Sequence, residues 1–137
     1  MLGVIGFGIS KIEAEKSPEV KGKISINNNI KINAVEKTDL FLGKNKQEGL
    51  KFSFEYVSTY DPKAGKIILI GNLVAVDDKE KVEEIVSGWK KNKKLSAEVL
   101  AHVLNSILNK CNIQAIILSR EIGLPSPVQL PKVQINK

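Results

Sequence analysis

The sequence has very few of the residues on which most catalytic and metal sites depend. It contains one cysteine, Cys111, one histidine, His102, and a single arginine, Arg120, among 21 basic residues. A lone cysteine has no disulfide partner in the chain, and a lone histidine supplies one ligand where a zinc site needs several. Cys111 and His102 fall on one predicted helix, about 13 Å apart along its axis. We therefore predict no enzyme activity, no metal and no cofactor, and the free thiol favours a reducing, cytoplasmic setting.

Long hydrophobic runs are also missing. The opening nine residues, MLGVIGFGI, are mostly apolar but fall far short of the roughly 20 residues that cross a bilayer. No basic residue precedes them, so we expect neither a membrane span nor a signal peptide. Their glycines do not have the spacing of a dinucleotide-binding fingerprint. A bulged or closely packed strand explains these glycines better.

The net charge of +6 is carried almost entirely by lysine. Lysine lacks the planar fork with which arginine recognises phosphates and base edges, so the charge alone argues weakly for nucleic-acid binding. The densest basic run lies where a helix is predicted to end, and cations are favoured at that end of the helix dipole. We interpret this run as the solvent-exposed C-terminal end of the helix, and a nucleic-acid-binding patch is the less favoured alternative. The run comprises Lys90, Lys91, Lys93 and Lys94.

Apolar residues alternate with polar ones in four successive segments, which predicts four strands, at about residues 4–16, 23–35, 50–60 and 66–76. The alternation of the first segment slips near Ser10, which predicts a β-bulge. In the second, isoleucines at even positions predict one core face, with a loop following at about 43–49. The turn 61–65 predicts an antiparallel hairpin between the third and fourth strands. The fourth segment is apolar on both faces, which is typical of a central strand or of a subunit interface; the candidate interface residues are Ile68, Ile70 and Leu73.

At Asp77 the apolar period changes to that of a helix. Helices are predicted at about 78–91 and 96–121, with Asp77 or Asp78 and then Ser96 as their caps. Trp89 falls on the apolar stripe of the first helix and is predicted to be a packing anchor. The long second helix has a broad buried stripe, which is predicted to comprise Leu100, Leu104, Ile107, Leu108, Cys111, Ala115 and Leu118, widened by Val99, Val103, Ile116 and Ile117.

The tail after Gly123 contains three prolines and cannot continue the helix or enter a central strand. We predict an extended surface segment over 124–137. The whole chain is then one α+β domain, residues 1–137, in which a four-stranded antiparallel sheet is followed by a short and a long helix on one face. Apolar residues of the tail are candidates for peptide binding, with docking on the domain's own sheet as the equal alternative; they are Leu124, Val128, Leu130 and Val133.

In this layout the chain resembles the SecB-type protein-export chaperones, as a divergent, archaeal-type relative. The segments KIEAEKSPEV and LKFSFEYVS stand where the family has its first and third strands, and the helix exit and tail give the best local match, through Leu118, Ser119, Arg120, Gly123, Leu130, Pro131 and Val133. The basic charge departs from the acidic character of the family. The resemblance implies a chaperone that binds apolar segments of non-native polypeptides.

Two functions of different classes thus follow from the sequence. The first is a SecB-like chaperone or holdase that needs no cofactor, because burial of apolar segments drives the binding. The second is an oligomeric interaction module of the same fold without chaperone activity. The expected partners are unfolded polypeptides and further copies of the chain, as a dimer or tetramer, with lysine-mediated nucleic-acid binding a less favoured third possibility.

Overall fold

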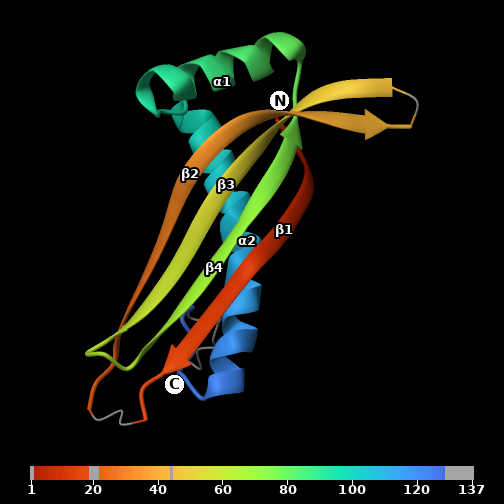
Figure 1. Cartoon of the computed structure of the whole chain (residues 1–137). Helices are drawn as coiled ribbons and strands as arrows, with labels where there is room; N and C mark the ends of the chain where they lie inside the picture. The colour runs from red at the N-terminus through yellow and green to blue at the C-terminus, as the bar shows by residue number, and fades with distance from the viewer. Residues whose placement is uncertain (1, 19–21, 44, 129–137) are drawn as a thin grey trace, which may run out of the picture.

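The computed structural model describes residues 2–18, 22–43 and 45–128, which form one sheet and two helices (Figure 1). The strands are β1 (Gly3–Lys16), β2 (Ser25–Leu42), β3 (Asn45–Asp61) and β4 (Gly65–Val76), followed by α1 (Lys79–Asn92) and α2 (Ala97–Ile122). The sheet order is β1-β4-β3-β2 with every pair antiparallel. Three strands are joined by hairpins and β1 lies beside the last of them, which is a Greek-key order. The predicted α+β plan is confirmed.

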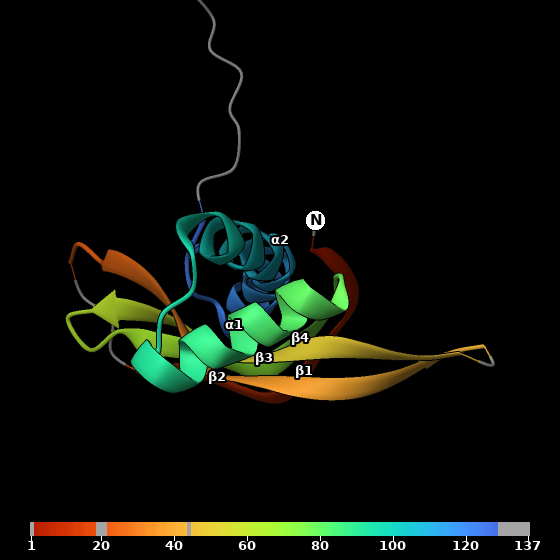
Figure 2. The ribbon, with the colours of Figure 1, turned by 90° about the horizontal axis from the view of Figure 1, so that it is seen from above.

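Both helices lie on one face of the sheet. Figure 2 shows α1 above β2 and β3, and α2 above β4 and β1. The alternate residues of β3 and β4 that face the helices are fully buried, whereas those on the opposite face are half-exposed. The core lies between the sheet and the two helices, and its largest fully buried side chains include Tyr56, Tyr60, Phe52, Phe54, Leu50, Ile67, Leu69, Leu73 and Ile107.

β4 is a central strand, as its apolar character on both faces predicts. Its helix-facing side chains alternate with Ile68 and Ile70, which point to the face that neither helix covers. Leu73 belongs to the opposite set and is fully buried against the core. The prediction that Leu73 shares a subunit interface with Ile68 and Ile70 is therefore wrong, because side chains an odd number of residues apart on a strand point to opposite faces.

β1 pairs with β4 through two register shifts. One lies between Val4 and Gly6, and the other lies between Ile9 and Lys11, which confirms the bulge predicted at Ser10. The Ser10 hydroxyl donates a hydrogen bond to the Ile70 carbonyl. Near this bulge the β1 backbone presses on Gly71 so closely that a Cβ there would lie 2.9 Å from the Ile9 Cα. The close strand packing inferred from the glycines is thus found, although the glycine that needs it is Gly71 of β4.

β2 and β3 run further than the sequence predicts. The segment around 43–49 was expected to be a loop, but Thr38–Leu42 pairs with Asn45–Gly49 in continuous register. Since β4 stops at the Gly49↔Val76 pair, the two strands project beyond the sheet as an arm, residues 39–43 and 45–48 (Figure 1). Four residues of extended strand reach about 14 Å. The arm was missed because its apolar residues, Leu40, Phe41 and Leu42, stand next to one another among polar residues and show no alternation.

The helix ends follow the predicted chemistry. Ser96 accepts a hydrogen bond from the Val99 amide, and Gly123 closes α2 in the left-handed conformation with φ 74°. Asp78 occupies the N-cap position of α1, but its side chain makes no capping hydrogen bond. Instead the Asp77 carboxylate accepts a hydrogen bond from the Asp78 amide. Both predicted cap positions are confirmed, and the capping bond is confirmed for Ser96.

The buried side of α2 is narrower than predicted. Its fully buried positions recur every four residues, so the contact follows a single ridge along the helix; they are Val99, Val103, Ile107, Cys111, Ala115 and Ser119. Leu100 and Ile117, which were assigned to the buried stripe, are 37% and 48% exposed. The broad apolar pattern therefore comprises one buried ridge and a second set of isoleucine and leucine side chains that face solvent.

Candidate polypeptide-binding surface

β2 forms one edge of the sheet and pairs only with β3 among the described strands. Its free edge exposes backbone N–H and C=O groups over a long stretch. Ile26, Ile30 and Ile32 lie opposite Tyr60, Tyr56 and Phe54, so they point to the helix-covered side. Together with Ile24 they form the isoleucine row, in which every side chain is partly buried against the core and partly open to solvent. A free strand edge beside an apolar row is the geometry that an added peptide strand requires.

A polar network begins at Asn28, within the isoleucine row, and continues into the core. The Ser58 hydroxyl, fully buried, donates to the Asn28 amide oxygen at 2.7 Å, and lies 3.1 Å from the Tyr56 hydroxyl. The Tyr56 hydroxyl in turn reaches Asn112 of α2 at 3.5 Å. Burial raises the pKa of Tyr56, and burial raises that of Tyr60 to about 12. Both phenols therefore stay neutral at physiological pH and act as hydrogen-bond donors.

Part of the tail is fastened over this network. The Tyr60 hydroxyl donates to the Pro125 carbonyl at 2.7 Å, and Asn28 donates to the Pro127 carbonyl at 2.8 Å. Pro127 is buried and Val128 is half-buried. Prolines have no amide hydrogen, so the segment cannot join the sheet as a strand. It is held by its carbonyl groups instead.

Leu124 belongs to the core and is only 6% exposed. Its methyl groups pack so closely on Gly65 that a Cβ there would lie 3.0 Å away. The prediction that Leu124 lines an open peptide site is therefore corrected: this residue docks the tail on its own domain. Val128 follows Pro127, whose carbonyl accepts a hydrogen bond from Asn28, so it lies beside β2. Leu130 and Val133 lie outside the described residues.

α2 adds a second apolar feature. Ile113 is 61% exposed and Ile117 is 48% exposed, and the spacing of four residues places them one above the other on the helix. Asn112, the neighbour of Ile113, faces Tyr56. Ile113 was not predicted as a binding residue from the sequence. Its position off the buried ridge of an amphipathic helix is the signal by which it could have been found.

The four lysines of the predicted basic patch are all exposed at the end of α1. Lys93 lies 5.6 Å from the centre of the Trp89 ring, a cation–π contact that covers the indole. Trp89 itself packs against the core, which confirms its prediction as a packing anchor. The basic patch, Lys90, Lys91, Lys93 and Lys94, thus occupies the helix end that the dipole favours.

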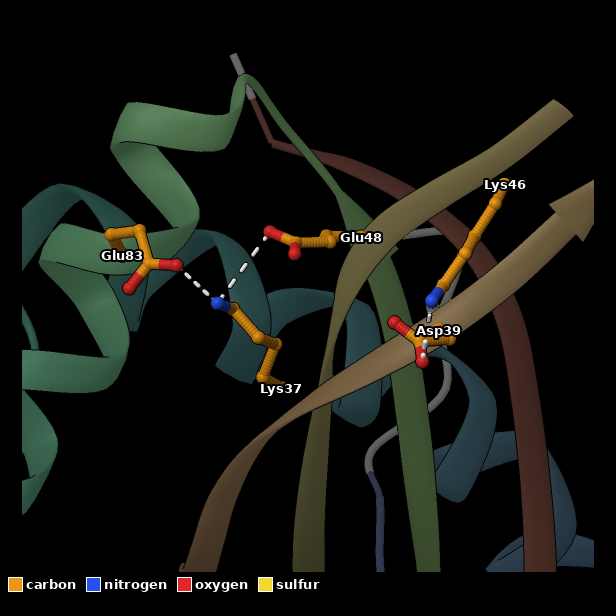
Figure 3. A network of polar contacts seen from close by, with 5 residues as sticks. All are labelled: Lys37, Asp39, Lys46, Glu48 and Glu83. Atoms are coloured by element: carbon orange, nitrogen blue, oxygen red, sulfur yellow. Dashed lines mark hydrogen bonds and ion pairs between the residues drawn. The ribbon is translucent and has the colours of Figure 1, made fainter.

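An ion-pair network ties the base of the arm to α1 (Figure 3). Lys37 contacts the carboxylate of Glu83 and lies 3.5 Å from that of Glu48. The hydrogen bond between Lys37 and Glu83 raises the pKa of Lys37 and lowers that of Glu83. A second pair, Lys46 with Asp39 at 3.4 Å, lies further along the arm. These exposed pairs orient the arm and add little stability.

We expect Glu83→Gln to lower stability slightly at neutral pH and to have no effect in acid. The lowered pKa of Glu83 means that its contribution is present above the usual pKa of 4.5 and is lost as the pH falls through its lower value in the folded state. Urea unfolding of both proteins at pH 7 and at about pH 3 tests this. Equal stability at neutral pH would show that the pair contributes nothing; Glu84→Gln, which removes an ion pair with Lys81 inside α1, compares a pair within the helix with the pair to the arm.

Cys111 is fully buried, and burial raises the pKa of its thiol to about 12. Only the thiolate reacts with disulfide reagents, so we expect the native protein to resist labelling at mildly alkaline pH and to react fully in urea. Asn109→Cys places a second thiol at an exposed position of the same helix and is expected to label at once. Rapid labelling of Cys111 in the native protein would contradict its burial.

His102 is exposed on α2, as expected for a residue at the polar edge of a helix. No group of three histidine, cysteine or carboxylate side chains lies close enough to hold a metal ion in the part of the chain that the structure describes. None of the helices within residues 2–18, 22–43 and 45–128 is long and apolar enough to cross a membrane.

The chain was compared with known proteins in three ways. It matches no protein-family model, no curated protein and no solved structure at a significant level.

Proposed function

We propose that the protein binds apolar segments of non-native polypeptides, without catalysis, along the free edge of β2. The single observation that carries the proposal is the coincidence of an open strand edge with the isoleucine row on its helix-covered side. A client in extended conformation pairs its backbone with β2, and its alternate side chains lie over the isoleucines. Main-chain bonds provide affinity without sequence preference, which suits a holdase.

The surroundings of the row support this mode of binding. The tail is fastened beside it by Asn28 and Tyr60, and elsewhere on the molecule Ile113 of α2 is a further apolar side chain in solvent. No charged residue takes part in the network of Asn28, Ser58 and Tyr56, so the floor of the surface is neutral. Apolar surface that stays open in the folded chain marks a site of interaction.

The SecB-type resemblance points to the same function. A four-stranded antiparallel sheet with both helices on one face is the frame that the resemblance implies. Fold likeness alone does not decide function, so the proposal rests on the β2 edge. A role in protein export and a cytoplasmic location remain predictions that follow from the resemblance and from the free thiol.

Suppression of aggregation tests the proposal directly. A chemically unfolded test protein is diluted with stoichiometric amounts of this chain, and light scattering is followed. We expect protection that a short peptide of alternating isoleucine and serine abolishes by competition. The same peptide with N-methyl groups on alternate residues cannot pair with a strand edge and is expected to compete at least tenfold more weakly. Equal competition by the two peptides would exclude strand addition.

The bare face of the sheet supports a second candidate function, that of an oligomeric interaction module. Ile68 and Ile70 are half-buried on this face beside Val57. Charged residues flank them on both sides, with Glu13 and Lys11 on β1 and Glu55 on β3. An Ile70→Lys variant that changes the mass in solution while keeping client protection would assign this face to assembly.

A further inference from the structure

The arm carries the most exposed large apolar side chain of the described residues. Phe41 is 75% exposed. It pairs directly across the arm with Lys46, so the two side chains lie next to each other on the same face. Lys37, two pairs nearer the sheet on that face, contacts α1. The arm therefore presents an aromatic ring and an ammonium group together, on the side of the sheet that carries the helices.

A pocket of complementary character lies at the same end of the molecule. It has a volume of about 440 Å³, which is within the usual range of binding pockets, about 300–1,000 Å³. Its apolar part is formed by Leu2 and Val99, both nearly buried. Its lining also contains three carboxylates, one lysine and one histidine, which are Asp77, Asp78, Glu98, Lys81 and His102. With three carboxylates and one lysine, the rim is net negative.

We propose that the arm of one copy of this chain docks in this pocket of a second copy, with Phe41 on Leu2 and Val99 and Lys46 against the acidic rim. Charge complementarity selects the occupant: an aromatic–lysine tip matches an apolar pocket rimmed by carboxylates. Among the described residues, Lys46 exchanges an ion pair with Asp39, both side chains being more than half exposed, and a place beside Asp77 and Asp78 of its own chain in a neighbouring pocket. Such pairs contribute little, so their exchange is inexpensive.

The position of the two partners fits a symmetric dimer. The pocket is built where β4 passes into α1, at Asp77 and Asp78, and the arm leaves the sheet at the end of the same strand. Both lie on the helix-covered side. In the proposed dimer a two-fold axis relates the two contacts, so each arm occupies the other subunit's pocket, as an isologous interface requires. The arm, a two-stranded ribbon that is marginal alone, gains packing from this contact.

Sedimentation of the full chain tests the proposal. We expect a dimer whose dissociation constant rises with salt, since the contact has an ionic component. Phe41→Ser changes a side chain that the fold does not need, and is expected to weaken the dimer at least tenfold. Ile12→Ser, at 49% exposure on β1, removes an exposed isoleucine elsewhere and is expected to leave the dimer intact.

The ionic part is tested by charge exchange. Lys46→Glu and Glu98→Lys are each expected to weaken dimerisation, and the double variant is expected to restore it because the pair is re-formed with reversed signs. A wild-type monomer at all concentrations, or a dimer that Phe41→Ser leaves unchanged, would overturn the proposal. Failure of the double variant to recover any affinity would overturn the contact of Lys46 with the rim. Client protection is measured separately, so these outcomes do not depend on the proposed function.

Discussion

Gly71→Ala is expected to lower the free energy of unfolding by about 3 kcal/mol, a cost typical of severe overpacking. Gly71 of β4 pairs with Ile9 of β1, and the β1 backbone approaches it closely. A Cβ added there would fall inside the contact distance of the Gly8 carbonyl oxygen and 2.9 Å from the Ile9 Cα. Both obstacles are backbone atoms, which cannot rotate away. The strands must separate, and the bulge at Ser10 together with the bond from Ser10 to Ile70 would be lost.

Gly8→Ala is the matched control for this prediction. Gly8 lies on the opposing strand, but a Cβ added there meets no atom within 4 Å. We expect a change within about 0.5 kcal/mol, as for surface substitutions. Urea unfolding of the two variants compares the same substitution on two strands that touch. If both variants are equally stable, the close backbone contact of β1 with Gly71 is not present.

The double substitution Ile30→Thr and Ile32→Thr is expected to reduce client affinity at least tenfold. Threonine keeps the branched shape and strand preference of isoleucine but replaces a methyl-bearing carbon with a hydroxyl. Two apolar contacts in the middle of the isoleucine row would be lost, each worth about 1 kcal/mol. Both side chains are partly exposed, so the fold is retained, which far-ultraviolet circular dichroism checks.

Asn29→Thr provides the control on the same strand. Asn29 lies opposite Val57 and points to the bare face of the sheet, so its substitution leaves the isoleucine row unchanged. We expect it to bind clients like the wild type. Fluorescence anisotropy of a labelled peptide of alternating isoleucine and serine measures both variants. Equal loss of affinity in the two would place binding on the backbone edge alone, and no loss in the double variant would remove the row from the site.

Local sequence patterns determined several parts of this fold. The alternation of β4 on both faces predicts a central strand because only a strand with neighbours on both sides buries so much apolar surface. The slip near Ser10 predicts the bulge because one extra residue reverses the alternation. Ser96 and Gly123 mark the ends of α2 through capping chemistry that needs no tertiary information.

The parts that could not be predicted depend on contacts between distant segments. The arm shows no apolar alternation, so only the pairing of β2 with β3 reveals it. Leu73 lies an odd number of residues from Ile68 and Ile70, so strand geometry alone excludes it from their face; what the apolar pattern of β4 could not show is which of its two faces the helices cover. Leu124 looked like a surface residue since prolines follow it, yet its contact with Gly65 buries it.

The candidate site divides in the same way. The isoleucines of β2 are visible as a period of two, but their partial exposure follows from the position of β2 at the edge of the sheet. Asn28 stands at an even position, on the side of the isoleucines, but nothing in the sequence indicated its bonds with Ser58 and the tail. A hydrogen bond across 99 residues of sequence leaves no local signal.

Backbone hydrogen exchange of the full chain, with and without the peptide of alternating isoleucine and serine, tests the central claim most directly. Strand addition predicts new protection of amides in the first half of β2, at residues 25–32, because their free edge becomes hydrogen-bonded. Amides of the basic patch and of the bare face of β4 are expected to remain unchanged. Protection confined to those regions, with β2 exchanging as before, would contradict polypeptide binding at the β2 edge.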